Sequence, residues 1–257
     1  MSGFGILLHK EWREALRTAK LIWLPAVFLL LGLLQPLTAK FMPDILASAG
    51  NLPEGTLIQI PVPTPGEVLG QTISQFGTVG LLAVCLAFMG TIAGEKRNGT
   101  ADWILVKPVS PLAYVASKWV VLCLIVAIAF GLGFGGSWYY TNLLIGVPNS
   151  GDALISAFLY YIWLVFIGTV TIMTSALLRS PAAAAFITFG GAIVLQLVHG
   201  LFDNKLSWLP SGLDAAAISK LATGSSPSWA GSAIVTGICI ATLLTVAAKG
   251  AGLRKKG

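Results

Sequence analysis

The stretch "WVVLCLIVAIAFGLGFGGSWYYTNLLI", residues 119–145, decides the fold class, because it contains no charged side chain. A helix of about 20 apolar residues is long enough to cross the hydrocarbon core of a membrane. Similar uncharged runs occupy 21–39, 68–94, 153–178, 180–202 and 221–248. We therefore predict six membrane-spanning helices, at residues 21–38, 76–93, 119–145, 154–178, 182–202 and 229–248.

The composition supports an all-α integral membrane protein. Of the 257 residues, 56% are hydrophobic and only 10% are charged, whereas soluble domains carry about 25% charged residues. Alternation with a period of two, which is typical of membrane barrels, is not visible. Cys85, Cys123 and Cys239 lie in apolar runs without metal-ligand spacing, so we expect neither a metal site nor a disulfide framework. The charged, amphipathic amino end predicts no cleavable signal peptide.

The basic residues predict the orientation, because Lys and Arg gather in short cytoplasmic loops. Thirteen of the 16 Lys and Arg residues fall in the amino segment, after the second and fourth spans, or in the tail. The loops between them hold only Lys40, Lys205 and Lys220. We predict a multi-pass protein of the cell membrane with both termini in the cytoplasm. Nucleic-acid binding is not expected, since no soluble basic face is present.

The amino segment "FGILLHKEWREALRTAK", residues 4–20, has an aromatic and aliphatic stripe opposite a basic stripe. Such a helix lies in the plane of the membrane interface. Its central residues, Lys10, Glu11, Trp12 and Arg13, place both charge signs beside an aromatic ring. The alternative is an ordinary topological anchor.

The spans themselves are expected to carry no charge, which argues against a proton- or ion-coupled secondary transporter. Thr171, Thr174 and Ser175 form a small polar face that we expect to pack helices closely. The proline-broken segment 39–70, with a short amphipathic piece leading into Gln71 and Gln75, and the segment 203–227 are expected to be loops on the outer side. A mostly neutral pathway fits an amphiphilic cargo such as a peptide, a lipid-like molecule or a drug.

The loop "GEKRNGTADWILVKPVSPLAYV", residues 94–115, is the most charged stretch between two spans. Ser110 and Pro111 are the residue types preferred at the N-cap and the first turn of a helix, here the third span. Trp103 and Ile104 would be apolar and exposed, with charged residues around them, which is typical of a docking surface. A plain cytosolic loop with snorkelling lysines is the alternative.

This loop strongly resembles the loop after the second span in permease subunits of the ATP-binding-cassette type-2 exporter family. The matching residues are Gly94, Glu95, Gly99, Thr100, Pro108, Val109, Ser110 and Lys118. "HKEWREALR", residues 9–17, is similar to the interfacial elbow helix of that family. "LLRSPAAAAF", residues 177–186, looks like its short loop before the fifth span.

The resemblance implies that loop 94–115 is a coupling helix seated in a separate ATPase subunit, which would hold ATP and Mg. The chain contains no GxxxxGK[ST] phosphate-binding loop, so we expect it to be no enzyme and to hold no cofactor or metal itself. A second permease chain, identical or a sister subunit, is also implied.

Roles for individual residues follow from the same resemblance. Glu95, Arg97 and Lys107 would make polar contacts with the ATPase, and Trp103 and Ile104 would be its apolar anchors. Gly99 and Pro108 would set the backbone. From the residues themselves, Thr100 and Ser110 are expected as helix caps and Lys118 at the membrane interface. Lys10, Glu11 and Arg13 would tie the elbow helix to the inner leaflet or to the edge of the ATPase.

Two other functions are alternatives to export. An intramembrane enzyme would need a carboxylate pair, a metal set or a Ser/Lys dyad at membrane depth, and His199 alone offers none. A sensory or scaffold subunit that binds the same ATPase without moving a cargo would keep the docking loop, and only a transport measurement separates it from an exporter.

Overall fold

A computed structural model describes residues 3–48, 63–99, 110–202, 206, 208–225 and 228–252. The regular elements in these ranges are all helices, and no strand occurs among them. Six helical segments are long and apolar enough to cross a membrane, which confirms the predicted number. The segments are Lys20–Met42, Pro65–Arg97, Pro111–Leu144, Ser150–Leu177, Pro181–Leu201 and Ala230–Ala251.

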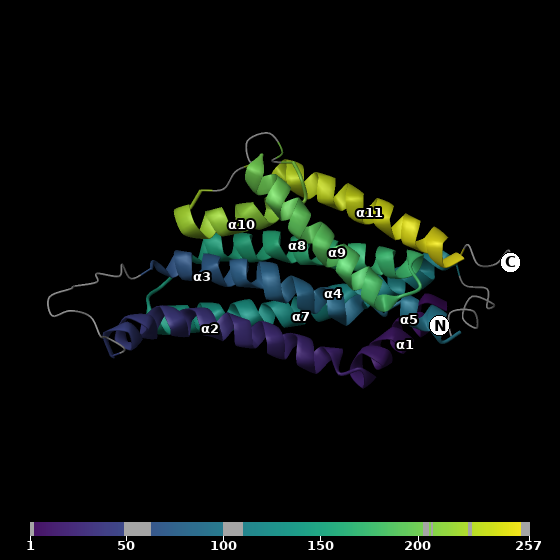
Figure 1. Ribbon diagram of the computed structural model, residues 1–257, viewed down its shortest axis with the longest axis horizontal. Helices are drawn as coiled ribbons and strands as arrows, with labels where there is room; N and C mark the ends of the chain where they lie inside the picture. Colours follow the sequence, from purple (N-terminus) through teal and green to yellow (C-terminus); the bar gives the residue numbers. More distant parts are fainter. Residues whose placement is uncertain are drawn as a thin grey trace.

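The bundle has two distinct ends (Figure 1). Helix α1 (Gly3–Arg17) and the last turns of α11 (Ala230–Gly252) lie at one end, here named the terminal end. The turn between α7 (Pro111–Leu144) and α8 (Ser150–Leu177) lies at the other, here named the opposite end. An even number of spans brings both chain ends to the same side of the bundle.

Helix α1 stops before the first span begins. Ala19 has a φ of +53°, in the left-handed region, and separates α1 from α2 (Lys20–Ser48). The irregular backbone predicted from residue 39 is wrong as far as Ser48, because α2 continues through Pro43. Proline is tolerated in membrane helices where local adjustments satisfy the freed backbone groups.

The second span is assembled from four consecutive helical pieces. These are α3 (Pro65–Gln75), the π-helix η1 (Phe76–Gly80), α4 (Leu81–Phe88) and α5 (Ala93–Arg97). A capping box starts the first piece: the Glu67 amide donates to Thr64 Oγ1, and the Thr64 amide donates to Glu67 Oε2 at 2.8 Å. The span therefore begins at Pro65 rather than near residue 76.

Serine and asparagine caps fix where the later spans begin. The predicted cap of α7 is confirmed, since Ser110 Oγ accepts from the Ala113 amide at 3.2 Å. Asn149 caps α8 in the same manner, and Ser180 caps α9 (Pro181–Leu201). Each oxygen satisfies an amide that has no partner within its own helix.

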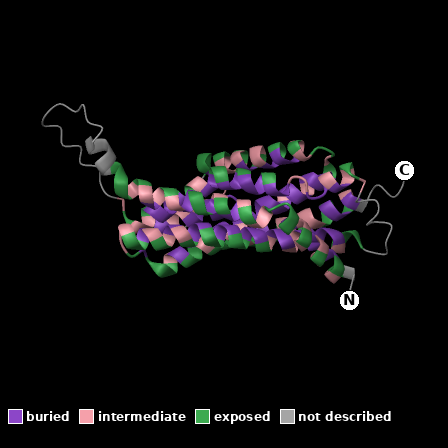
Figure 2. Cartoon of the chain, turned by 90° about the horizontal axis from the view of Figure 1, so that it is seen from below, coloured by how far each residue is buried: buried purple, intermediate pink, exposed green. Residues whose placement is uncertain are grey.

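Glycines bring the first and third spans into direct backbone contact. A Cβ on Gly133 of α7 would lie 2.5 Å from the carbonyl oxygen of Phe28, and one on Gly32 of α2 would overlap the carbonyl of Gly133. Around this crossing, Phe28, Phe76, Phe130 and Tyr160 form a chain of ring contacts with centroids 5.0 to 6.4 Å apart. Figure 2 shows the buried residues on the faces that the helices turn toward one another.

An additional helix, α10 (Gly212–Thr223), lies within the segment that the sequence analysis predicted to be a loop. It packs along α3 and α8 toward the opposite end of the bundle (Figure 1). A Cβ on Gly66 of α3 would overlap the carbonyl oxygen of Leu221, and Gly70 faces Ile218. A salt bridge of 3.0 Å between Lys220 and Asp152 joins α10 to α8. Helix α10 can therefore approach α3 closely because Gly66 and Gly70 carry no side chain.

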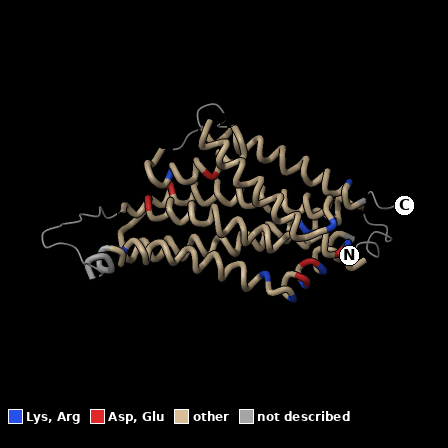
Figure 3. The backbone as a smooth tube through the Cα atoms, in the orientation of Figure 1, with Lys and Arg blue, Asp and Glu red and all other residues tan. Residues whose placement is uncertain are grey.

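Charged residues lie mostly toward the two ends of the bundle (Figure 3). Basic residues of α1, α5, the start of α7 and the end of α11 meet at the terminal end, while Lys40 and Lys220 belong to helices that reach the opposite end. The asymmetry predicted from the sequence is therefore present in three dimensions among the described residues.

Candidate functional site at the terminal end

Five side chains from three helices form a buried ion cluster at the terminal end. The cluster consists of Lys10 and Glu11 from α1, Glu95 from α5, and Tyr114 and Lys118 from α7. All but Lys10 are buried, with exposures of 8% or less. The cluster therefore joins the amino-terminal helix to the base of the 94–115 loop and to the third span.

Lys118 is at the centre of the cluster. Its side chain is fully buried, and its Nζ lies 2.9 Å from Glu11 Oε1 and 3.0 Å from Glu95 Oε1. The same ammonium group lies 4.9 Å from the centre of the Tyr114 ring, within the range of a cation–π contact. A buried ammonium is stable only when its charge is compensated and its hydrogens are bonded. The two carboxylates supply both.

Lys10 and Tyr114 complete the bonding of the two carboxylates. Lys10 Nζ lies 2.9 Å from Glu11 Oε1 and also pairs with Glu95 Oε1. The Tyr114 hydroxyl donates to the other oxygen of Glu95. Burial alone would lower the pKa of Lys10, but attraction to Glu11 and Glu95 outweighs it, so the pKa is raised above the usual lysine range. The lysine thus stays charged across the physiological range.

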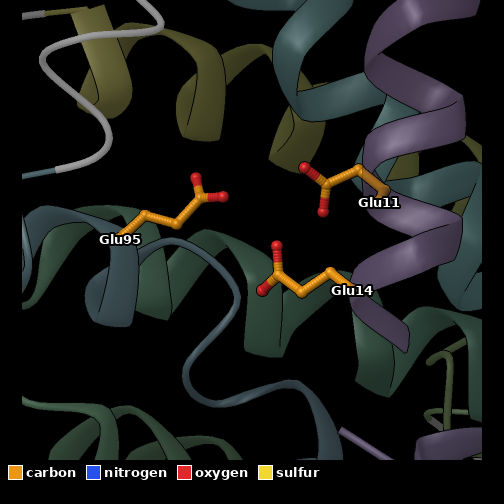
Figure 4. Close-up of side chains that lie close together, drawn as sticks. All are labelled: Glu11, Glu14 and Glu95. Atoms are coloured by element: carbon orange, nitrogen blue, oxygen red, sulfur yellow. The ribbon is translucent and has the colours of Figure 1, made fainter. Parts of the chain in front are cut away.

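Three carboxylates converge here, those of Glu11, Glu14 and Glu95, with one oxygen of each within 4.8 Å of the others (Figure 4). Such a group resembles a set of oxygen ligands for a hard cation. Each of the three is, however, bonded to an ammonium group: Glu14 Oε2 lies 3.3 Å from Lys10, and the other two are shared with Lys118. The lysines supply the counter-charge that a metal ion would bring.

A second set of contacts fixes the start of α5 against the end of α8. Ser175 Oγ accepts from the amides of Ile92 and Ala93, at 3.1 and 2.9 Å, and donates to the carbonyl of Met89 at 2.7 Å. One buried hydroxyl therefore satisfies three backbone groups at the end of the second span. This use of the 171–175 polar face agrees with the predicted packing role, as does the 3.0 Å contact of Thr174 with Thr188 of α9.

Lys96 extends this attachment to the last helix. Its ammonium group donates to the carbonyl of Ala176 at the end of α8 and, at 3.1 Å, to the carbonyl of Gly250 in α11. Glu95 and Lys96 are neighbours in the sequence and point to different partners. The short helix α5 is consequently bonded to α1, α7, α8 and α11 at once.

The structure describes part of the predicted docking set. Arg97 is exposed and Gly99 has a φ of +73°, which favours glycine. Thr100, Trp103, Ile104, Lys107 and Pro108 lie outside the described residues. In the elbow helix, Arg13 is exposed and Trp12 is half-buried. Their predicted contacts with an ATPase stay predictions.

Two predicted placements differ from the structure. Lys118 was expected at the membrane interface, and Glu95 at the rim of a docking groove, yet both are buried inside the cluster. Glu11 likewise points inward, because Leu7, Glu11 and Ala15 form the buried stripe of α1. Each of these charged groups can be buried because a partner of opposite sign from another helix neutralises it.

Sequence reasoning missed the contributions of Tyr114 and Lys96. A lysine and an acidic residue in adjacent loops can always remain solvated, so no spacing rule indicated that they would pair across helices. The i, i+4 spacing of Tyr114 and Lys118, which places both on one face of the third span, was the only available signal.

Comparison with known proteins gives the family of the chain. Residues 6–214 match the model of the ABC-2 family transporter proteins. The chain is also similar to YxlG, an uncharacterized transmembrane protein of Bacillus subtilis (strain 168), with 35% identity over 240 residues and coverage of 93% of each chain. The family match spans α1, α5 and the described parts of spans one to five. With six helices able to cross a membrane, the chain belongs to the ABC-2 transporter family, as a multi-pass membrane component of an ABC transporter.

Proposed function

We propose that this chain is the permease subunit of an ABC exporter, driven through segment 94–115 by a separate ATPase subunit that binds ATP and Mg. The observation that carries the proposal is the bonding of α5. Glu95 and Lys96, at the start of that segment, contact α1, α7, α8 and α11 together. A force applied to the segment would therefore reach four helices through short, buried contacts.

The absence of ATP chemistry from the sequence fits this division of labour. No GxxxxGK[ST] motif occurs in the 257 residues, so nothing in the chain resembles a phosphate-binding loop. Energy would have to enter from another protein. The exposed Arg97 and the left-handed Gly99 lie where the chain leaves α5 toward residues 100–109, which makes this corner the natural point of contact.

The orientation and assembly are parts of the same proposal. Basic residues gather at the terminal end, which would face the cytoplasm of a cell-membrane protein. Two permease chains, identical or sister subunits, would enclose the pathway. Its mostly uncharged spans suit an amphiphilic cargo such as a peptide, a lipid-like molecule or a drug.

The first experiment isolates the intact chain from its native membrane and identifies bound proteins by mass spectrometry, with ATP hydrolysis measured on the same sample. A stoichiometric ATPase is expected. Trp103→Ala should weaken its binding, while Lys249→Met, at an exposed lysine of α11, should not. Recovery of the folded permease with no ATPase at all would refute the proposal.

Gly99 gives a matched pair of variants for the same experiment. Gly99→Val places a β-branched residue at a φ of +73° and should reduce ATPase binding. Gly99→Asn should retain it, because asparagine tolerates the left-handed region. Equal binding by both variants would show that the backbone at Gly99 does not present the docking segment.

Transport must be measured separately from ATPase binding. In vesicles that contain the purified complex, ATP should drive movement of an amphiphilic fluorescent peptide or phospholipid analogue. A complex that binds and stimulates its ATPase but moves neither probe would favour the sensory or scaffold role.

A further inference from the structure

Asp214 of α10 is a carboxyl group buried among four helices at a distance from the ion cluster. Its side chain is 8% exposed. Oδ2 accepts a hydrogen bond of 2.8 Å from the side-chain Nε2 of Gln196 on α9, while Oδ1 has no hydrogen-bond partner among the described residues. The spans were expected to carry no charged residue inside the bundle, and the docking of α10 places an ionisable carboxyl group there.

The packing register shows which groups surround Asp214. On α3, Gly66 faces Leu221 and Gly70 faces Ile218, so α3 and α10 run antiparallel. In the following π-helix, Gly77 faces the side-chain amide of Gln196. On α8, Asp152 pairs with Lys220. Two turns further along α8, Tyr160 is fully buried. It lies close enough to Asp214 for an ionised Asp214 carboxylate to interact electrostatically with its hydroxyl.

Among the described residues, no lysine or arginine forms a salt bridge with Asp214, and the nearest lysine on α10, Lys220, is bound to Asp152. From α8 the facing titratable group is the Tyr160 phenol, whose hydroxyl also has no hydrogen-bond partner within the described part of the chain. From α9 the facing groups are Gln196 and, one turn on, His199. On α3, Gly66 and Gly70 face Leu221 and Ile218 of α10, and on α10 itself Lys220 is engaged with Asp152.

We propose that Asp214 is a proton-binding site, occupied when α10 is docked against α3, α8 and α9 and vacated when α10 leaves them. The bonding favours this ligand, because a protonated carboxyl keeps its Oδ2 contact with Gln196 and loses the uncompensated charge on Oδ1. The π-helix η1 lies beside this site, because its Gly77 faces Gln196. Short π-helical segments of this kind are frequent at functional positions.

The titration behaviour agrees with this geometry. Burial raises the pKa of Asp214 to about 7, although the hydrogen bond from Gln196 opposes the rise. The docked state therefore binds a proton between pH 4 and pH 7, where an exposed aspartate does not. Because the docked state holds more protons, its stability is highest in acid and decreases as the pH rises toward 7.

The consequence is a membrane protein whose end opposite to the ATPase-docking segment responds to pH. Helix α10 would stay packed in acid and open more readily above neutrality. This inference concerns the docking of α10 alone and does not depend on the proposed coupling role, so either can fail without the other.

The test measures how often α10 opens. Ala217, which is fully buried on α10, is changed to Cys in the full-length chain with Cys85, Cys123 and Cys239 replaced by Ala. Maleimide labelling rates are compared with those of the same protein carrying Asp214→Asn, at equal pH, so that the pH dependence of the reagent cancels. Asparagine reproduces the neutral carboxyl.

The ratio of labelling rates, aspartate over asparagine, should rise between pH 5 and pH 7 and level off above pH 7, so that it is roughly 100-fold higher at pH 8 than at pH 5. A ratio that stays within twofold across this range would overturn the proposal. Asp152→Asn, which removes the Lys220 contact, should increase labelling equally at both pH values and serves as the matched control.

Two further measurements keep the assignment specific. His199→Gln should leave the pH dependence in place; its disappearance would assign the effect to the imidazole and refute the role of Asp214. If the asparagine variant does not fold, thermal unfolding of the unmodified chain tests the proposal instead. Its Tm should fall by roughly 5 °C between pH 5 and pH 7, and an unchanged or higher Tm at pH 7 refutes the proposal.

Discussion

Replacing Lys118 with methionine removes the charge at the centre of the ion cluster while keeping a side chain of similar length. The ammonium group lies 2.9 and 3.0 Å from Glu11 and Glu95. At an effective dielectric constant of about 20, each contact is worth about 6 kcal/mol of Coulomb energy. The cost of desolvating three charged groups offsets most of this gain. Losing one partner of a buried pair nevertheless costs about 3–5 kcal/mol, because the remaining carboxylates stay buried and repel each other.

A second substitution, Glu11→Gln, predicts the direction in which stability changes. Glu11→Gln in the Lys118→Met background removes one of the two carboxylates that have lost Lys118 and are left to share Lys10. The double variant should therefore be more stable than Lys118→Met alone, by about 1–3 kcal/mol. Independent sites would give the opposite result, with each change adding its own loss.

Thermal unfolding of the purified protein in detergent measures both effects. For a chain of this length, 3–5 kcal/mol corresponds to a decrease in Tm of roughly 10 °C. Lys249→Met, at an exposed lysine of α11, is the control and should change Tm by about 1 °C or less. A Lys118→Met protein that melts like the control, or a double variant less stable than both single variants, would refute the account of the cluster.

Three other substitutions test separate contacts. Gly133→Ala should destabilise the protein by about 1–3 kcal/mol in thermal unfolding, because its Cβ would meet the Phe28 carbonyl, whereas Gly237→Ala in open space on α11 should not. Ser175→Ala should cost about 1–3 kcal/mol and speed hydrogen exchange at the amides of residues 92 and 93; unchanged exchange would show that the Ser175 hydroxyl does not hold these amides. Gly66→Ala should loosen α10 alone, seen as faster labelling of a cysteine at position 217 with little change in the rest of the bundle.

The sequence determined the class of the protein for a simple physical reason. A membrane span needs a long uncharged run, and this requirement is local, so each of the six spans could be recognised independently. The cap at Ser110 was predictable on the same ground, since its partner amide lies three residues away. The asymmetry of Lys and Arg between loops also needs no knowledge of tertiary contacts.

The tertiary structure alone decided where the charged groups of the loops go. Glu95 and Lys118 are compatible with a solvated loop and a membrane interface, and only the convergence of α1, α5 and α7 makes burial favourable for both. Helix α10 was missed because its docking depends on the bare face made by Gly66 and Gly70, far away in the chain. The sequence thus specified what each segment is, whereas the partners of Glu95, Lys118 and Asp214 depend on distances between segments, which no local pattern contains.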